Sequence, residues 1–216
     1  DLDIVLMDCS RPFGNGRLLP AGRLRENPYR AIERADIIVF TRYSGDESYK
    51  EIVNNYKNTG NVRYKNAGKA EKIFFTTCHR PFLYSFSGIN KKIISTLEDL
   101  KGRKASLFSG IADNLSFRKT VEKLGVPVKA HLEFNDNHMY KDDEISMILE
   151  TSYRSGADMI VTTEKDYSRL GRALLERLKV MDFGVIGVEI DFLDNAEEFM
   201  NIIKNRLNRN LQKNDS

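Results

Sequence analysis

The sequence predicts an α/β fold with a mainly parallel sheet flanked by helices. Its short apolar runs, such as DIIVFT and DMIVTT, are continuous rather than alternating, which is typical of strands buried on both faces. Longer segments with helical periodicity separate these runs, and Gly residues follow several of the expected helices. Strands that alternate with helices favour a parallel sheet with right-handed crossovers.

Composition limits the classes of protein that fit. With 41% apolar residues among 216, the chain can bury a proper core. Its net charge of +3, from 34 Lys and Arg against 31 Asp and Glu, is too weak and too dispersed for a dedicated duplex-binding protein. Cys9 and Cys78 form no CxxC pair or disulfide framework, which favours a reducing compartment.

Two features of the chain concern its surroundings. No apolar run approaches the roughly 18 residues of a membrane-spanning helix, so we expect any membrane contact to be peripheral. The chain begins at Asp1, directly before an expected strand, rather than at a Met. We therefore expect it to be part of a longer protein.

The N-terminal third predicts a strand, loop, helix and strand in order. We expect strands at Asp3 to Met7 and Asp36 to Thr41, with a helix at Pro28 to Arg34 between them. A second helix is expected at Asp46 to Tyr56, followed by a polar connector at Thr59 to Glu71.

The middle of the chain predicts a small inserted strand pair. Lys72 to Thr77 and Phe82 to Ser87 are strand-like runs on either side of Arg80-Pro81, as in a hairpin or a small separate sheet. Ile89 to Lys101 has a helical period that Gly102 would end. Residues 57–102 are thus a candidate insert.

The C-terminal half returns to alternating strands and helices. We expect strands at 105–109, 126–132, 158–162 and 185–190, and helices at 114–124, 142–155, 163–178 and 195–208. Together these elements predict a single α/β domain over residues 1–210, with a disordered tail at 211–216.

Three polar loops follow expected strands: Asp8 to Glu26, Phe134 to Tyr140, and Thr162 to Asp166. In an open parallel sheet, the loops at the carboxyl ends of the strands converge on one edge, where ligands bind. Side chains from these loops are therefore the candidate functional residues.

The first loop contains RPFGNGRLLPAGRLRE. Gly14, Asn15 and Gly16 leave backbone amides open to close approach, and Arg11 and Arg25 supply donors suited to phosphate oxygens. A structural loop with solvated arginines is the alternative. Asp8 stands where phosphate-binding enzymes often place a magnesium ligand, although a carboxylate at a strand end is common.

The second loop, FNDNHMY, brings Asp136 within two residues of His138. Such a pair can act as acid and base or orient an attacking hydroxyl, and a solvent-facing His is the alternative. In the third loop, Thr162 or Thr163 can cap the following helix, and Glu164 suits its first turn. Lys165 can hold a phosphate, with Glu164 or Asp166 fixing its direction, or it is an exposed surface Lys.

Nucleotide and zinc motifs are absent from the sequence. It has no Gly-x4-Gly-Lys-Ser/Thr run, and Gly14-Asn-Gly16 lacks the third glycine of the dinucleotide fingerprint. No spacing of Cys or His supports zinc. An aromatic and basic face of the kind that binds nucleic acid is not displayed either.

The loops together resemble one family, the tetraacyldisaccharide 4'-kinases, or lipid A 4'-kinases, of Gram-negative bacteria. The match lies in DLDIVLMDCSRPFGNGRLLPAGRLRE, in FSGIADNLSFRKTVEKLG, in EFNDNHMY and in TTEKD. The last two are similar to the family's Asp-His-His-x-Tyr loop and its Thr-Glu-Lys-Asp run. Four motifs in the same order are a specific signal.

The resemblance implies a P-loop-kinase-like fold and transfer of the γ-phosphate of ATP, with Mg²⁺, to the 4'-hydroxyl of tetraacyldisaccharide 1-phosphate. The resemblance also implies that the enzyme lies at the cytoplasmic face of the inner membrane, in peripheral contact with it, and that it has no nucleic-acid partner. The family's P-loop and its Asp-Asp-Gly-Phe-Gln-His motif would precede Asp1. This chain would be the C-terminal part, and alone it should be inactive.

The resemblance also suggests roles. Asp136 and His138, or Asn137, would orient the carboxylate base of the missing part, Lys165 and Arg25 would neutralise phosphate, and Asn15 would order its loop. The chain departs from the family at Asn137, where the family has a His, since Asn cannot take a proton near neutral pH. It also lacks the family's Asn-Pro between Ala112 and Ser116.

A second hypothesis belongs to another class. The chain could be a non-catalytic module, derived from the same family, that binds a lipid phosphate or a protein partner. A P-loop encoded upstream of Asp1 favours the kinase, whereas a natural start at Asp1 favours the module.

Overall fold

The computed structural model describes residues 2–22, 24–43, 45, 73–87 and 96–214. Its contacts divide the chain into two compact units, the first formed by Asp1–His79 with Ile190–Ser216 and the second by Arg80–Glu189. The single domain at 1–210 and the tail at 211–216 stay predictions. The helix predicted at Asp46 to Tyr56 and the connector at Thr59 to Glu71 lie outside the described residues.

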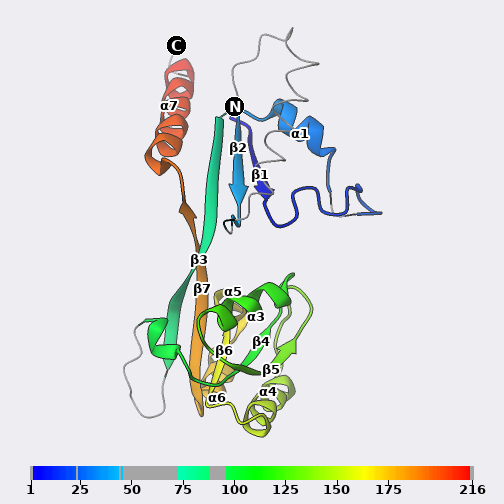
Figure 1. The fold of residues 1–216 in the computed structure, drawn as a ribbon, viewed down its shortest axis with the longest axis vertical. Coiled ribbons are helices and arrows are strands. Elements are labelled where there is room, and N and C mark those ends of the chain that lie inside the picture. Colours follow the sequence, from blue (N-terminus) through cyan, green and yellow to red (C-terminus); the bar gives the residue numbers. More distant parts are fainter. Residues whose placement is uncertain (1, 23, 44, 46–72, 88–95, 215–216) are drawn as a thin grey trace. The chain divides into compact units, whose positions relative to one another are not determined.

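The first unit has a parallel sheet between two helices (Figure 1). Strands β1 (Ile4–Asp8) and β2 (Ile37–Thr41) pair in parallel, and β2 pairs with the start of β3 (Ile73–Ser87). Helix α1 (Pro28–Arg34) lies between β1 and β2 in sequence, and α7 (Ala196–Asn214) ends the chain. The predicted strand–helix–strand order is confirmed here.

Each face of this sheet has its own apolar core. On the α1 face the core consists of Met7, Ile32, Ala35, Ile38 and Phe40. On the α7 face it consists of Ile37, Val39 and Phe75, with Phe199 and Ile202 of the helix packed against them. Because neighbours along β2 point to opposite cores, the whole strand is buried, as its continuous apolar run predicts.

The second unit repeats this plan on a larger scale. In the order of pairing, its strands are β7 (Asp182–Phe192), β6 (Met159–Thr163), β4 (Ala105–Ser109) and β5 (Val128–Glu133), and β7 with β6, β6 with β4, and β4 with β5 pair in parallel. The helices are α3 (Asn114–Lys123), α4 (Asp142–Arg154), α5 (Glu164–Arg169) and α6 (Arg172–Leu178). Within the described residues, the strands follow the order β1-β2-β3-β7-β6-β4-β5.

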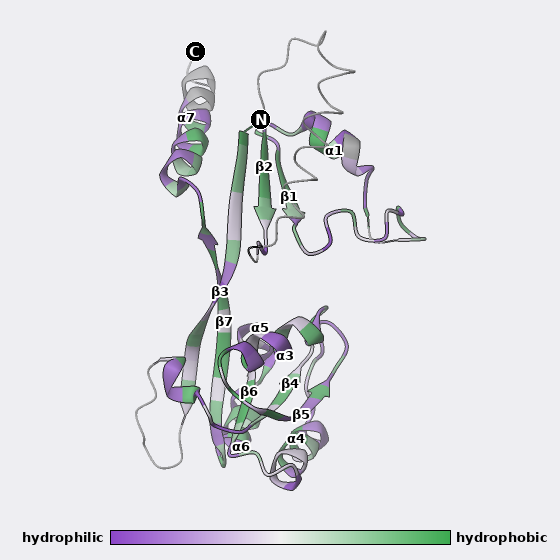
Figure 2. Ribbon diagram, in the orientation of Figure 1, coloured by the Kyte–Doolittle hydropathy of each residue, from purple (hydrophilic) through white to green (hydrophobic). Residues whose placement is uncertain are grey.

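Helices cover both faces of the second unit's strands. Phe117 and Val121 of α3 pack with Leu107, Met159 and Val161, whereas Ile145 and Ile148 of α4 pack with Phe108, Ile160 and Phe183. The inner strands β4 and β6 are accordingly buried along their length, whereas the edge strand β5 alternates apolar with polar residues and is mixed in colour in Figure 2. The predicted α/β fold with a mainly parallel sheet flanked by helices is confirmed.

The predicted strand pair at 72–87 is wrong. A single strand, β3, runs from Ile73 to Ser87 straight through Arg80-Pro81. Its pairing with β2 ends at Thr76, so β2 requires no backbone N–H at Pro81. Proline is tolerated on a strand edge where no ladder hydrogen bond is lost.

Three helical predictions also need adjustment. Of Ile89 to Lys101, the first seven residues lie outside the described ones, and the rest contains the 3-10 helix η1 (Glu98–Leu100). The helix predicted over 163–178 is two helices, because Leu170 adopts an extended conformation with ψ 123° and is buried in the core. Finally, α7 continues to Asn214 rather than ending at residue 208.

Candidate functional site

Two of the three predicted loops meet at one edge of the second unit. Strand β4 pairs in parallel with both β5 and β6, so the carboxyl ends of all three strands point the same way. The residues after β4, the loop after β5 and the start of α5 therefore lie together, as predicted for Phe134 to Tyr140 and Thr162 to Asp166. The loop at Asp8 to Glu26 belongs to the first unit, so its convergence with the other two stays a prediction.

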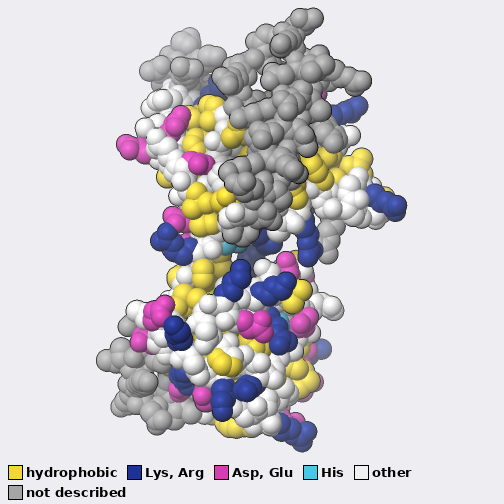
Figure 3. Space-filling model, in the orientation of Figure 1, with side chains coloured by type: hydrophobic (Ala, Val, Ile, Leu, Met, Phe, Trp, Pro, Cys, Tyr) yellow, Lys and Arg dark blue, Asp and Glu magenta, His cyan; other side chains and the backbone are white. Residues whose placement is uncertain are grey.

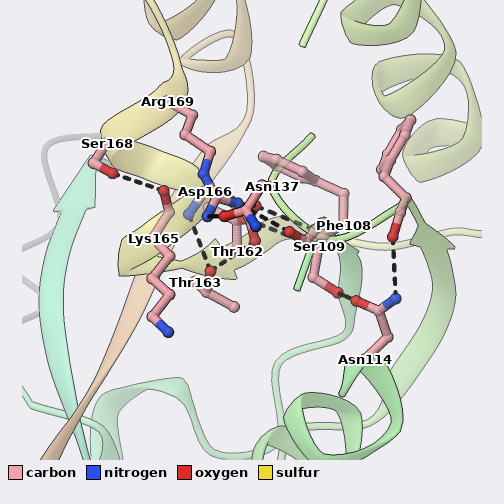
Figure 4. Close-up of polar contacts among 12 residues, drawn as sticks. Phe108, Ser109, Asn114, Asn137, Thr162, Thr163, Lys165, Asp166, Ser168 and Arg169 are labelled. Carbon is pink, nitrogen blue, oxygen red and sulfur yellow. Dashed lines mark hydrogen bonds and ion pairs between the residues drawn. The ribbon is translucent and has the colours of Figure 1, made fainter. Parts of the chain in front are cut away.

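Asp166 is the buried centre of this edge (Figure 4). Its side chain is 0% exposed, and Oδ1 accepts hydrogen bonds from the backbone N–H of Gly110 at 3.1 Å and from Nη1 of Arg169 at 3.2 Å. Oδ2 accepts from Oγ1 of Thr163 at 2.7 Å. A buried carboxylate is tolerated only when its oxygens are satisfied in this way.

The two threonines before α5 have different tasks. Thr163 is the N-cap, since its Oγ1 accepts the backbone N–H of Asp166 at 3.1 Å. Thr162 is buried and donates from Oγ1 to the carbonyl of Phe108 at 2.9 Å. The cap therefore belongs to Thr163, one of the two residues that the sequence allows.

Arg169 links α5 to the loop after β5. Its Nη1 donates to the carbonyl of Gly110 at 2.9 Å, and its Nη2 donates to Oδ1 of Asn137 at 2.8 Å. The Asn137 backbone has a φ of 62°, a left-handed conformation that Asn tolerates better than most residues, and its N–H donates to Gly110 at 3.0 Å. Asn137 thus has a structural task here.

Gly110 allows the loop to approach β4. A Cβ at this position would lie 2.8 Å from Cβ of His138 and 3.2 Å from the hydroxyl oxygen of Tyr140. Any larger residue would push the loop away from the strand. The conformation of Phe134 to Tyr140 thus depends on Gly110, Arg169 and Asp166, none of which lies within the loop.

The carboxylate partner of His138 is Glu144, not Asp136 as the spacing predicts. Nε2 of His138 lies 2.9 and 3.0 Å from the two carboxylate oxygens of Glu144, which also accepts the backbone N–H of Lys141 at 2.8 Å. Asp136 is exposed, and no contact of its side chain is found within the described part of the chain. The spacing fails because Glu144 is in the first turn of α4, which folds back to the loop.

Two ionisable groups beside His138 have shifted pKa values. Partial burial raises the pKa of Glu144, but the hydrogen bonds from His138 and Lys141 outweigh it and hold that pKa below its usual value. Burial and the neighbouring Asp166 carboxylate raise the pKa of Tyr140 well above its ordinary range. The buried Tyr140 hydroxyl lies beside the Asp166 carboxylate and stays neutral.

A second polar cluster fixes the start of the loop. Oγ of Ser109 donates to Oδ1 of Asn114 at 2.7 Å and lies 2.8 Å from Nε2 of His131. Nδ2 of Asn114 donates to the carbonyl of Phe134 at 3.3 Å. Burial lowers the pKa of His131, so its imidazole is neutral at pH 7 and serves a structural role.

Lys165 and Glu164 differ from their neighbour Asp166. Lys165 is exposed, and its side chain extends away from the Asp166 cluster (Figure 4), with no partner for Nζ in the described ranges. Glu164 is half-buried in the first turn of α5, and a Cβ on Gly187 would lie 2.8 Å from its Oε2. The exposure of Lys165 fits both a phosphate contact and an ordinary surface Lys, so its phosphate role stays a prediction.

In the first unit, the loop after β1 is held by local turns. Gly14 and Gly16 have φ of 54° and 71°, which glycine adopts without strain. Oδ1 of Asn15 accepts the backbone N–H of Arg17 at 3.2 Å, and its Nδ2 donates to the carbonyl of Ala21 at 3.3 Å. Arg11 and Arg25 are exposed.

Asp8, the predicted magnesium ligand, contacts Ser10 and Arg42. Oδ1 accepts from the backbone N–H and Oγ of Ser10 at 2.9 and 2.6 Å, and Oδ2 lies 3.3 Å from Nη1 of Arg42. A search of the described residues finds no group of three or more His, Cys, Asp or Glu that would hold a metal ion. Since Mg²⁺ is often held by one or two carboxylates together with phosphates and waters, the magnesium role of Asp8 stays a prediction.

The surface carries mixed charge. On the face shown in Figure 3, basic and acidic side chains are interspersed over the second unit. This distribution agrees with the small net charge of +3 and does not favour a nucleic-acid interface. Among the described helices, none has the length and apolar character needed to cross a membrane.

Comparisons with known proteins agree on one family. Residues 1–208 match the family model described as tetraacyldisaccharide-1-P 4'-kinase, LpxK. A tetraacyldisaccharide 4'-kinase from Syntrophus aciditrophicus is 38% identical over 184 residues, which are 82% of this chain and 46% of that protein. One from Desulfatibacillum aliphaticivorans is 33% identical over 217 residues, which are 96% of this chain and 52% of that protein.

A solved structure gives the same answer. The chain resembles the "apo" form of LpxK from Aquifex aeolicus in complex with ATP, with a TM-score of 0.52 and 25% identity. The similarity covers 94% of this chain and 52% of that one. The chain therefore spans about half the length of the relatives that it matches.

Proposed function

Because the chain belongs to the tetraacyldisaccharide-1-P 4'-kinase family, we propose that it forms the C-terminal part of an enzyme that phosphorylates the 4'-hydroxyl of tetraacyldisaccharide 1-phosphate. The phosphoryl donor is ATP, a proposal supported by the similar LpxK structure with ATP. We place the enzyme, as a peripheral protein, at the cytoplasmic face of the inner membrane of a Gram-negative bacterium. Magnesium is expected with ATP in such reactions.

One observation carries the proposal. At the edge of the second unit, an exposed lysine in the first turn of α5 and a carboxylate-paired imidazole in the loop after β5 lie on either side of the buried Asp166 cluster. Phosphoryl transfer depends on positioning and on neutralising charge, rather than on covalent help from the protein. Lys165 at this edge is suited to neutralising charge, and His138 is suited to positioning the reacting groups.

We assign roles to the residues accordingly. Lys165 and Arg25 neutralise phosphate oxygens, with Arg11 as a further donor to the phosphate of the disaccharide. Asp136 and His138 orient the carboxylate base, which residues outside this chain supply. Asn15, with Gly14 and Gly16, orders the first loop, and Glu164 and Asp166 set the direction of α5 behind Lys165.

Asn137 is better suited to a supporting role than to a catalytic one. Its Oδ1 accepts a hydrogen bond from Arg169, and its backbone N–H is bound to Gly110. An amide cannot take a proton near neutral pH. The proton-accepting side chain of this loop is therefore His138.

The test is a 4'-kinase assay of the full-length enzyme with Asp136→Ala, His138→Ala and Lys165→Ala. We expect kcat to fall by roughly 10²-fold or more for His138→Ala, because positioned acid–base groups contribute about that much, and by a similar factor for Lys165→Ala. Lys119→Ala, an exposed residue on α3, is the control and should keep full activity.

Two outcomes would contradict the proposal at different levels. Normal rates for all three variants would remove these residues from the mechanism while leaving the activity in place. A full-length protein that transfers no phosphate to the disaccharide would overturn the function and favour a non-catalytic binding module.

A further inference from the structure

The imidazole of His138 is held on three sides. Its ring stacks on Phe134 with centroids 4.7 Å apart and meets the ring of Tyr140 edge-on at 5.1 Å. Nε2 points at the carboxylate of Glu144, at 2.9 and 3.0 Å from its two oxygens. The side chains of His138 and Glu144 are only 22% and 20% exposed, so solvent weakens their contact less than it would a surface pair.

This geometry determines which nitrogen carries the proton. A carboxylate accepts hydrogen bonds and cannot donate them, so Nε2 must bear the hydrogen that bridges to Glu144. In the neutral imidazole, Nδ1 then carries the lone pair. Within the described part of the chain, Nδ1 makes no hydrogen bond, so it is available to another group.

We propose that Glu144 is a positioning residue of the phosphoryl transfer, one that fixes His138 in its Nε2–H form and leaves Nδ1 to bond with the reacting groups. The inference rests on the proposed function and deepens it. Nδ1 accepts a hydrogen bond while the imidazole is neutral and donates one after taking a proton. A third group that orients a base in this manner is common to several kinds of active site.

Helix capping alone does not account for Glu144. As the N3 residue of α4 it accepts the backbone N–H of Lys141, which is one half of a capping box, and the Lys141 ammonium cannot accept the bond that would form the other half. That bond needs one oxygen, yet both carboxylate oxygens lie within hydrogen-bond distance of Nε2. Glutamine serves as well as glutamate in a capping box, so Glu144→Gln keeps the cap and removes the charge.

Other groups near His138 cannot take over this role. Tyr140 is neutral, and its hydroxyl is buried beside the Asp166 carboxylate. The Asp166 carboxylate is engaged by Thr163, Gly110 and Arg169. Asp136 is exposed, and its side chain has no contact with His138.

Two measurements on the full-length protein test the proposal. Long-range ¹H–¹⁵N correlation spectra, with His138 identified by the signal lost in His138→Gln, report which ring nitrogen bears the proton. The kinase assay reports kcat and KM. The variants are Glu144→Gln, Glu144→Ala and, as a matched control in the same helical turn, Asp143→Asn, whose side chain does not touch His138.

We expect a slowly exchanging Nε2–H signal in the unchanged protein and in Asp143→Asn, and its loss in Glu144→Ala. We expect kcat to fall about tenfold in Glu144→Gln with KM unchanged, and in Glu144→Ala to approach the loss of roughly 10²-fold expected for His138→Ala. Thermal melting of Glu144→Gln should match that of the unchanged protein.

The results that would contradict the role of Glu144 differ from those that would contradict the proposed function. An Nδ1–H form in the unchanged protein, or a Glu144→Ala variant with normal kcat, would overturn the role of Glu144. An unchanged protein without kinase activity would overturn the proposed function instead, and the spectra would still decide whether Glu144 fixes the imidazole.

Discussion

Two loop regions of this protein follow parallel strands and contain the same kinds of residue, yet they are held in different ways. In the first unit, the loop after β1 is shaped by glycine turns and by Asn15, whose side-chain hydrogen bonds among the described residues are to its near neighbours Arg17 and Ala21. In the second unit, the loop after β5 is held by Arg169 and by the backbone of Gly110, both far away in sequence.

The two aspartates make the difference plain. The side chain of Asp8 is 35% exposed and is paired with Ser10 and Arg42, whereas that of Asp166 is 0% exposed and binds Gly110 of a distant segment as well as Arg169 of its own helix. When a partly exposed carboxylate is removed, water can make the hydrogen bonds that the carboxylate made. A buried one leaves its partners unsatisfied, so we expect the second region to be far less tolerant of substitution.

The largest expected effect is that of Asp166→Ala. Removing the carboxylate leaves the Arg169 guanidinium and the Gly110 N–H without this acceptor. Loss of one partner of a buried ion pair costs about 3–5 kcal/mol of unfolding free energy. Asp8→Ala should cost about 0–1 kcal/mol, as expected for an exposed pair. Urea denaturation of both variants measures the difference, and similar losses would show that the two regions do not differ in this way.

A smaller contrast is expected between the two asparagines. Asn137→Ala loses the bond to Arg169 and puts alanine at a φ of 62°, which costs about 1–2 kcal/mol for the conformation alone. Asn15→Ala loses two exposed hydrogen bonds, for which about 1 kcal/mol is typical. Denaturant midpoints, with Asn137→Gly as the control that relieves the strain, should rank the variants in this order.

The smallest effect concerns pH and two histidines. Burial lowers the pKa of His131, and partial burial together with Arg42 lowers that of His79, although His79 itself stays exposed to solvent. Below about pH 6.5 the unfolded chain binds the proton more readily than the folded chain, so stability is full above that pH and falls as the pH drops through the folded-state value. The loss of stability at low pH should be reduced more by His131→Gln than by His79→Gln, because the side chain of His131 is 2% exposed, whereas His79 is exposed.

Urea midpoints between pH 5 and 8 would show this dependence. If His131→Gln left the pH dependence unchanged, the burial of His131 would not be the cause of the acid sensitivity.

The sequence by itself determined the local architecture. The continuous apolar runs of β2 and β6 predict strands that are buried on both faces, because neither face of such a strand carries polar side chains for contact with solvent. Gly125 and Gly156 end helices with φ of 75° and 68°, as their positions predict. The loops that could carry chemistry were also visible, since polar residues after buried strands mark the functional edge of a parallel sheet.

Only the tertiary structure decided which side chains meet. The run through Arg80-Pro81 has turn-like residues, but burial and pairing keep β3 extended from Ile73 to Ser87. The only sequence signal for Arg169 is its spacing of three from Asp166 on a helix, which indicates an ordinary ion pair. Its bonds to Gly110 and Asn137 span 59 and 32 residues, and Glu144 displaces Asp136 as the partner of His138.

The physical reason is the range of the interactions. Turn, cap and strand preferences act within a few residues and can be read in order along the chain. A buried ion pair or a fixed imidazole depends on which surfaces the folded core brings together, and on the burial that makes an unsatisfied partner costly.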